Sequence, residues 1–142
     1  RQLAAAMLTL ADRQVHSYLE VGVYSGWTAC LLSAWFTRLA SNFHATAVDV
    51  KDYTTDDAHQ LLQQLHGRLI MRDVFDFKLL QRNRTVPSFD LCFIDGDHTY
   101  RGVRADYMSL APHCRSIMFH DIVDLSNWAY DLRAIDRGSK DP

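Results

Sequence analysis

Long hydrophobic runs are missing from this chain of 142 residues. Its apolar runs extend over only a few residues each, far short of the roughly 20 that a helix needs to cross a bilayer, so no membrane span is expected. An excess of basic charge is missing as well, because 15 lysines and arginines stand against 17 aspartates and glutamates. A chain with a net charge of −2 has no cationic surplus with which to hold a phosphate backbone, which disfavours nucleic acid as a partner.

Cysteine is scarce too, and its positions follow no pairing pattern. Cys30, Cys92 and Cys114 are odd in number and widely spaced, with neither a Cys-x-x-Cys pair nor zinc-finger spacing. We therefore expect buried thiols, in the cytoplasm or another reducing intracellular compartment. An initiating methionine is also missing, because the chain starts at Arg1, and we expect it to have been trimmed from a longer protein.

What the sequence does contain is the composition of an ordinary globular domain, 48% hydrophobic and 23% charged. We expect one domain over residues 1–137, followed by a polar tail at 138–142. Short apolar runs alternate with stretches of helical periodicity, which predicts a doubly wound α/β fold with a parallel sheet. The expected strands are 18–23, 45–49, 69–71, 89–94 and 116–119. Helices are expected at 3–11, 27–35, around 77–80, 103–111 and 125–135. A further helix is expected between the second and third strands, with Thr54 or Thr55 as its N-cap and Gly67 at its end.

Acidic residues gather where the predicted strands end. The strand ends hold residues 20–26, Asp49, Asp73, residues 95–98 and residues 120–121. In a doubly wound sheet, ligands bind beyond the carboxyl ends of the strands. A single aspartate at such a position is typical of a turn or a helix cap. Four successive strands that end in or just before an aspartate favour a binding site along this edge.

The loop after the first strand holds two glycines, Gly22 and Gly26, instead of the three that cradle a dinucleotide pyrophosphate. Gly22 would allow a ligand to approach the backbone closely, although a tight strand-to-helix turn would explain both glycines as well. Glu20, inside the strand, suits a cationic or hydroxylated ligand better than a pyrophosphate. Asp49 is placed to accept hydrogen bonds from two ribose hydroxyls.

Three stretches carry a family resemblance. Residues 18–28, YLEVGVYSGWT, resemble the first motif of class I S-adenosylmethionine-dependent methyltransferases. Residues 89–100, FDLCFIDGDHTY, and 119–122, FHDI, are similar to the small O-methyltransferase branch that includes catechol O-methyltransferase and the sugar and macrolide O-methyltransferases. The likeness extends from Ser17 to Ile122, and it implies a mainly parallel, Rossmann-like methyltransferase sheet.

The resemblance implies a site for the methyl donor S-adenosylmethionine. In such a site Glu20 lies near the donor's amino group, Asp49 binds the ribose, and Asp95 faces the methyl group. Asp73, Val74 and Phe75 would flank the adenine. The implied donor-binding residues are Glu20, Gly22, Tyr24, Ser25, Gly26, Asp49, Asp73, Val74, Phe75 and Asp95.

The resemblance also implies catalytic and metal-binding groups. Asp95 and His98 would be catalytic, with His98 as the general base in place of the branch's lysine. Asp95, His120 and Asp121 would hold a divalent cation, Mg²⁺ or Mn²⁺. His120 and Asp121 replace the Asp-Asn pair of the branch, and a histidine beside two carboxylates favours a transition metal over an all-oxygen magnesium site.

The chain departs from the branch at its end. Only residues 123–142 follow Ile122, enough for one helix, so we expect the sheet to lack the C-terminal antiparallel strand pair. An open sheet edge needs a cover. We therefore expect a protein partner or a second copy of the chain at this edge.

Two hypotheses of different classes follow. The first is an S-adenosylmethionine-dependent methyltransferase that transfers a methyl group to a hydroxyl of a small molecule, with divalent metal assistance. The alternative is a catalytically silent methyltransferase-like module, a structural or interaction component of a larger assembly, which the missing strands and altered metal pair would suit. A nicotinamide-dependent Rossmann domain is disfavoured, because the middle glycine is missing and Asp49 lies further from Gly22 than that fingerprint requires.

Overall fold

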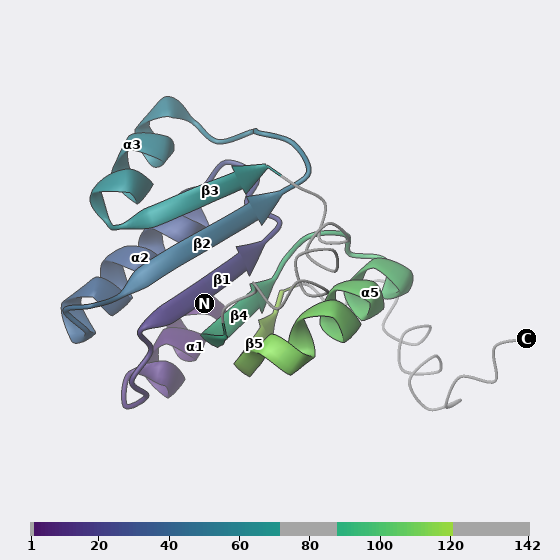
Figure 1. Ribbon diagram of the computed structural model, residues 1–142, viewed down its shortest axis with the longest axis horizontal. Coiled ribbons are helices and arrows are strands. Elements are labelled where there is room, and N and C mark those ends of the chain that lie inside the picture. The colour runs from purple at the N-terminus through teal and green to yellow at the C-terminus, as the bar shows by residue number, and fades with distance from the viewer. Residues whose placement is uncertain (1, 72–87, 121–142) are drawn as a thin grey trace, which may run out of the picture.

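The architecture is a parallel sheet with helices on both faces (Figure 1). The computed structural model describes residues 2–71 and 88–120. The strands of this part are β1 Ser17–Val21, β2 His44–Asp49, β3 Gly67–Met71, β4 Phe89–Ile94 and β5 Cys114–Phe119. The helices are α1 Gln2–Leu10, α2 Trp27–Leu39, α3 Asp56–Gln64 and α5 Tyr100–Leu110, with a short 3₁₀ turn at Ala111–His113. The predicted α/β fold is confirmed.

The strand order β3-β2-β1-β4-β5 places β1 at the centre of the described sheet. All neighbouring strands in this order run parallel. Along the chain, β2 and β3 follow on one side of β1, and β4 and β5 follow on its other side. The order therefore reverses between β1 and β4. Ligands of doubly wound proteins bind at such a reversal, outside the carboxyl ends of the strands.

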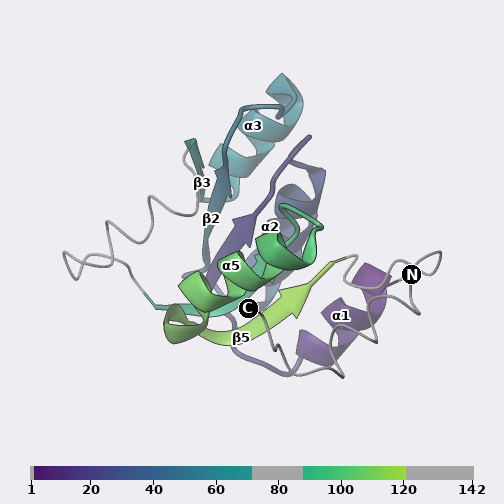
Figure 2. The ribbon, with the colours of Figure 1, turned by 90° about the vertical axis from the view of Figure 1, so that its right-hand side faces the viewer.

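Apolar side chains form a core on each face of the sheet. On one face Tyr18 and Phe93 belong to the same buried cluster as Phe36 of α2. On the other face Leu19 shares a cluster with Leu110 of α5. In Figure 2, β5 runs between α5 and α1. Successive side chains of a strand point to opposite faces, so a strand covered on both sides reads as the nearly continuous apolar run seen in the sequence.

The third helix begins as predicted but ends earlier. Thr55 is the N-cap of α3, and its hydroxyl accepts a hydrogen bond from the Ala58 N–H at 3.2 Å. The prediction that Gly67 ends this helix is wrong, because the turn comes at His66, which has a φ of 58°, and Gly67 is the first residue of β3. Gly67 has a packing role instead, since a Cβ there would collide with the side chain of Leu62.

The cysteines also correct the expectation from sequence. Cys92 of β4 and Cys114 of β5 form a disulfide, with their Cα atoms 5.8 Å apart. Cys30 is a buried free thiol, as predicted. The prediction of free thiols is thus wrong for two of the three cysteines, because strand packing brings together residues that are 22 positions apart. The expectation of a reducing compartment rested on free thiols, and the disulfide removes that support.

The helices predicted around 77–80 and 125–135 lie outside the described residues. Within residues 2–71 and 88–120, no helix has the length and apolar character that a membrane crossing requires.

Candidate functional site

A cavity of about 560 Å³ opens at the carboxyl ends of β1, β2 and β4, at the reversal of strand order. Its walls come from the loops after these three strands and from the first half of α5. The lining residues are Val21, Gly22, Tyr24, Val48, Asp49, Val50, Tyr53, Asp95, Gly96, Asp97, His98, Gly102, Ala105 and Asp106.

Gly22 makes the floor of this cavity possible. Its N–H donates to the Val48 carbonyl at 3.0 Å, and its φ is 84°, a backbone conformation that side chains rarely adopt. A Cβ at this position would collide with the backbone carbonyl of Asp95. The loops after β1 and β4 therefore touch through a residue that has no side chain. The sequence suggested that Gly22 lets a ligand approach the backbone closely. In the structure, Gly22 lets the loop after β4 approach the loop after β1.

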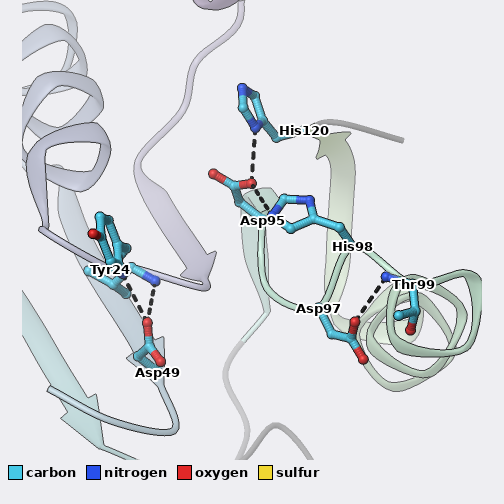
Figure 3. Close-up of polar contacts among 8 residues, drawn as sticks. Tyr24, Asp49, Asp95, Asp97, His98, Thr99 and His120 are labelled. Carbon is cyan, nitrogen blue, oxygen red and sulfur yellow. Dashed lines mark hydrogen bonds and ion pairs between the residues drawn. The ribbon is translucent and has the colours of Figure 1, made fainter. Parts of the chain in front are cut away.

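Asp49 holds the loop after β1 in place (Figure 3). One of its oxygens, Oδ2, accepts hydrogen bonds from the N–H groups of Val23 at 2.8 Å and Tyr24 at 2.9 Å. Its other oxygen, Oδ1, accepts from the Lys51 N–H at 3.3 Å. Tyr24 has a φ of 47°, so these bonds maintain a backbone conformation that is strained for a bulky residue. Each carboxylate oxygen has two acceptor positions, so Asp49 keeps capacity for a ligand hydroxyl.

Glu20 is not among the lining residues of the cavity, and it shares a face of β1 with Tyr18, whereas Val21 lines the cavity. The Glu20 side chain is fully buried and accepts a hydrogen bond from the Tyr18 hydroxyl. Burial raises the pKa of Glu20 to about 8, a rise that the Tyr18 hydrogen bond opposes and the charge of Asp95 supports. The contact between Glu20 and a donor amino group stays a prediction. What the structure shows is a buried carboxyl whose oxygen accepts the Tyr18 hydroxyl hydrogen bond.

Asp95, His98 and His120 come together at the other end of the site (Figure 3). His120 Nδ1 lies 3.0 Å from Asp95 Oδ1, and His98 Nε2 lies 3.8 Å from the same oxygen. The backbone of β5 supports this arrangement, because the His120 N–H donates to the Ile94 carbonyl at 3.1 Å. Asp121, the other predicted metal ligand, lies outside the described residues. Within those residues, no group of three or more potential ligands forms a metal site.

The described lining of the cavity is rich in acidic side chains. Four carboxylates line it, from Asp49, Asp95, Asp97 and Asp106, and among the described residues no lysine or arginine does. A carboxylate near opposite charge is favoured, and one near like charge is disfavoured. This cavity therefore suits a ligand with positive charge and hydroxyl donors, and it opposes a pyrophosphate.

The other predicted donor-binding residues divide into two groups. Ser25 and Gly26 lie in the loop between β1 and α2, where Gly26 is the N-cap of α2 with a φ of 87°. Asp73, Val74 and Phe75 lie outside the described residues. Sequence reasoning missed several lining residues, namely Val50, Tyr53, Gly102 and Asp106. Asp97 also lines the cavity; it belongs to the predicted strand end 95–98, although no role was predicted for it.

Known proteins resemble this chain in sequence and in fold. Residues 19–122 match a family described as a methyltransferase domain. No curated protein matches significantly. The fold is similar to that of the O-methyltransferase TomG of Streptomyces achromogenes, solved in complex with S-adenosylmethionine, with a TM-score of 0.70, 15% identity, and coverage of 96% of this chain and 66% of that one.

Two further solved structures show the same fold. The O-methyltransferase of Bacillus cereus, in complex with S-adenosylhomocysteine, has a TM-score of 0.68 and 20% identity, with 99% of this chain and 62% of that chain covered. CalS11, a TDP-rhamnose 3′-O-methyltransferase of calicheamicin biosynthesis, has a TM-score of 0.63 and 16% identity, with coverage of 97% and 71%. This chain thus spans about two thirds of the length of the structures it matches. The segment that matches the family contains the whole described sheet except the first two residues of β1. The chain therefore belongs to the methyltransferase domain family.

Proposed function

We propose that this chain forms the catalytic domain of an S-adenosylmethionine-dependent O-methyltransferase that acts on a small hydroxylated molecule. One observation carries the proposal. In a chain of the methyltransferase domain family, the cavity at the reversal of strand order is lined by four carboxylates and, among the described residues, by no basic side chain. Such a cavity attracts the sulfonium and ammonium groups of the donor.

Two parts of the donor, the ribose and the amino acid part, have matching groups in the described residues. The acceptor position that stays free on Asp49 Oδ1 suits a ribose hydroxyl. The loop after β1, which Gly22 and Gly26 shape, suits the amino acid part of the donor. When bound, the donor supplies an electrophilic methyl carbon on a positively charged sulfur. The protein's main task is then to align that carbon with an acceptor oxygen.

His98 is the proposed general base. It lines the cavity and its side chain is about half exposed, so an acceptor hydroxyl can reach it. In the proposed step a bond forms between the acceptor oxygen and the methyl carbon, the bond from that carbon to sulfur breaks, and the hydroxyl proton moves to the imidazole of His98. Asp95, whose Oδ1 lies 3.8 Å from His98 Nε2, stabilises the imidazolium. Such proton transfer typically contributes about 10²–10⁴-fold to the rate.

A divalent cation would fit near Asp95. Its Oδ1 already lies between two imidazoles, which gives oxygen and nitrogen donors of the kind that Mn²⁺ and other transition metals accept. In this proposal Asp95, His120 and Asp121 hold Mg²⁺ or Mn²⁺, which would orient the acceptor and promote its deprotonation. Titration with Mn²⁺, followed by electron paramagnetic resonance, tests this directly. Binding that His120→Ala leaves unchanged would remove the metal from the proposal.

Donor binding and turnover together test the proposed function. We expect S-adenosylhomocysteine to bind in isothermal titration, and Asp49→Asn to weaken it at least tenfold. Asparagine keeps one oxygen for the loop amides but loses the charge, and Asp12→Asn on the exposed surface is the matched control. We also expect methylation of hydroxylated acceptors, detected as S-adenosylhomocysteine release, to fall about 10²-fold or more in His98→Ala. Binding without turnover on any acceptor would instead indicate a silent module.

A further inference from the structure

The outer face of α2 is apolar. This helix has one charged side chain, Arg38, in its 13 residues. On its outer side Trp27 is 51% exposed and Leu31 is 49% exposed. A helix that is hydrophobic on all sides is normally buried, and large apolar side chains that gather on a surface mark a contact with another molecule. α2 therefore has the character of a helix that is covered on its outer side as well.

Four residues form a single stripe along this face. Trp27, Leu31, Ala34 and Arg38 follow one another at intervals of four, three and four residues, which keeps side chains on one side of an α-helix. All four are exposed or partly exposed. The stripe shares no member with the buried residues of α2, which are Ala29, Cys30, Leu32, Ser33 and Phe36. The stripe therefore faces away from the sheet.

The stripe is complementary to itself. Its centre lies midway between Leu31 and Ala34, so a second α2 that runs antiparallel across a twofold axis places Leu31 opposite Ala34 and Trp27 opposite Arg38. A larger side chain then meets a smaller one at the centre, and a guanidinium meets an indole ring at each end, which is a favourable cation–π pair. The antiparallel arrangement also brings the positive end of one helix dipole beside the negative end of the other. A parallel arrangement would instead bring two Arg38 cations together, which is unfavourable.

We propose that two copies of this chain associate through α2, as an antiparallel pair in which Trp27 of each copy meets Arg38 of the other. An interface that uses the same surface of both copies is the commonest kind in soluble oligomers. Tryptophan and arginine, at the ends of the stripe, are also the residues that contribute most to the affinity of protein interfaces. This surface is separate from the sheet edge at β5, where the sequence predicts a cover, because α2 packs on β2. The proposal does not depend on the catalytic activity.

Sedimentation equilibrium of the natural protein and two variants tests the contact through α2. We expect the natural protein to form a dimer whose population rises with concentration. Leu31→Lys places a cation near the centre of the pair and should weaken association at least about tenfold. Met108→Lys is the matched control, because Met108 is an exposed apolar residue of α5, which covers the opposite face of the sheet (Figure 1), and it should leave association unchanged. Circular dichroism confirms that each variant is folded.

A charge exchange tests the antiparallel pairing. The lysine of Trp27→Lys would face Arg38 of the other copy, so this variant should associate at least about tenfold more weakly. Trp27→Lys/Arg38→Glu places opposite charges face to face and should restore association to within about fivefold of the natural protein. Weak association that the double variant does not restore would overturn the antiparallel pair. A natural protein that is a monomer at every concentration, or a dimer that Leu31→Lys or Trp27→Lys leaves intact, would overturn the contact through α2.

Discussion

At the scale of single residues, the site depends on left-handed backbone at three positions of one loop. Gly22, Tyr24 and Gly26 have φ values of 84°, 47° and 87°. Glycine adopts this region without strain, whereas a bulky residue needs support from its surroundings. Tyr24 receives that support from Asp49, so the same carboxylate that we assign to the ribose also shapes the loop beside it. Binding and loop geometry are thus coupled through one side chain.

Gly22→Ala tests the contact between the loops. The new Cβ would collide with the Asp95 backbone, and the φ of 84° would strain any side chain. We expect a loss of at least about 1 kcal/mol in the free energy of unfolding, measured with urea, together with much weaker binding of S-adenosylhomocysteine. Gly96→Ala is the matched control for stability, because its nearest neighbour would be an Asp106 oxygen at 3.3 Å and no left-handed φ is involved. Normal stability and binding in Gly22→Ala would contradict this account of the cavity floor.

Glu20 should make the stability of the protein depend on pH. Its pKa is raised from an ordinary value of 4.5 to about 8 in the folded state, mainly by burial. Between these two pH values the folded state holds a proton that the unfolded state has released. Stability therefore falls as pH rises through this window, by about 1.4 kcal/mol per pH unit from this group.

Glu20→Gln isolates this dependence, because glutamine fills the same space and carries no charge at any pH. We expect the variant to lose the downward slope of unfolding free energy between pH 5 and 8, as measured by urea titration at each pH. Asp57→Asn, an exposed carboxylate in the first turn of α3, should keep the slope of the natural protein. A slope that survives in Glu20→Gln would mean that Glu20 is already ionised at neutral pH in the fold.

At the scale of helices and strands, hydrophobic periodicity predicts most of what the structure describes. The predicted strands at 89–94 and 45–49 agree with β4 and β2 to within a residue, because buried parallel strands have a strong apolar signal. The end of α3 was not predictable in this way. His66 takes the left-handed position that the sequence suggested for Gly67, and Gly67 is needed where β3 passes Leu62.

The sequence predicts which strand ends form the site. It predicts less well which side chains of those strands and loops point into the cavity. Asp49, Asp95, His98 and His120 lie at one edge, as the topology requires. Glu20 does not reach the cavity, because it shares a strand face with Tyr18 and hydrogen-bonds to it. Tyr53 lies in a loop, where no periodic pattern marks a residue as lining a cavity.

The link between β4 and β5 should contribute measurably to stability. The disulfide between Cys92 and Cys114 closes a segment with a sequence separation of 22 residues. In the chain-entropy description, a closure of this length contributes about 3 kcal/mol. We expect Cys92→Ala/Cys114→Ala to lose a stability of this order in urea unfolding, and strong thiol reductants to have a similar effect on the natural protein.

Thiol counting gives an independent check on this link. Under denaturing, non-reducing conditions, one reactive thiol per chain is expected, that of Cys30. Cys30→Ala serves as the control, with no reactive thiol before reduction and two after it. Three reactive thiols in the freshly purified natural protein would show that the strands associate without a covalent link.

At the scale of the whole molecule, charge is distributed unevenly. The net charge is only −2, so the composition alone does not predict a strongly anionic site. The fold concentrates four aspartates around one cavity: three follow the carboxyl ends of parallel strands, which meet at the same edge of the sheet, and Asp106 comes from α5. The potential that a ligand meets in this cavity is therefore far more negative than the total charge suggests.

This concentration of charge should let the protein distinguish ligands that differ by one positive charge. In sinefungin a carbon that bears an amino group replaces the neutral sulfur of S-adenosylhomocysteine, and the rest of the two molecules is the same. We expect sinefungin to bind about fivefold more tightly at low salt, since nearby carboxylates attract the added charge by roughly 1 kcal/mol. The preference should shrink as ionic strength rises from about 0.01 to 0.15 M and the screening length falls from roughly 30 to 8 Å. Asp97→Asn should reduce the preference at low salt, whereas Asp12→Asn on the exposed surface should not. Equal affinity for the two ligands at every salt concentration would mean that the carboxylates do not act on the bound donor, and the electrostatic basis of the proposed function would then fail.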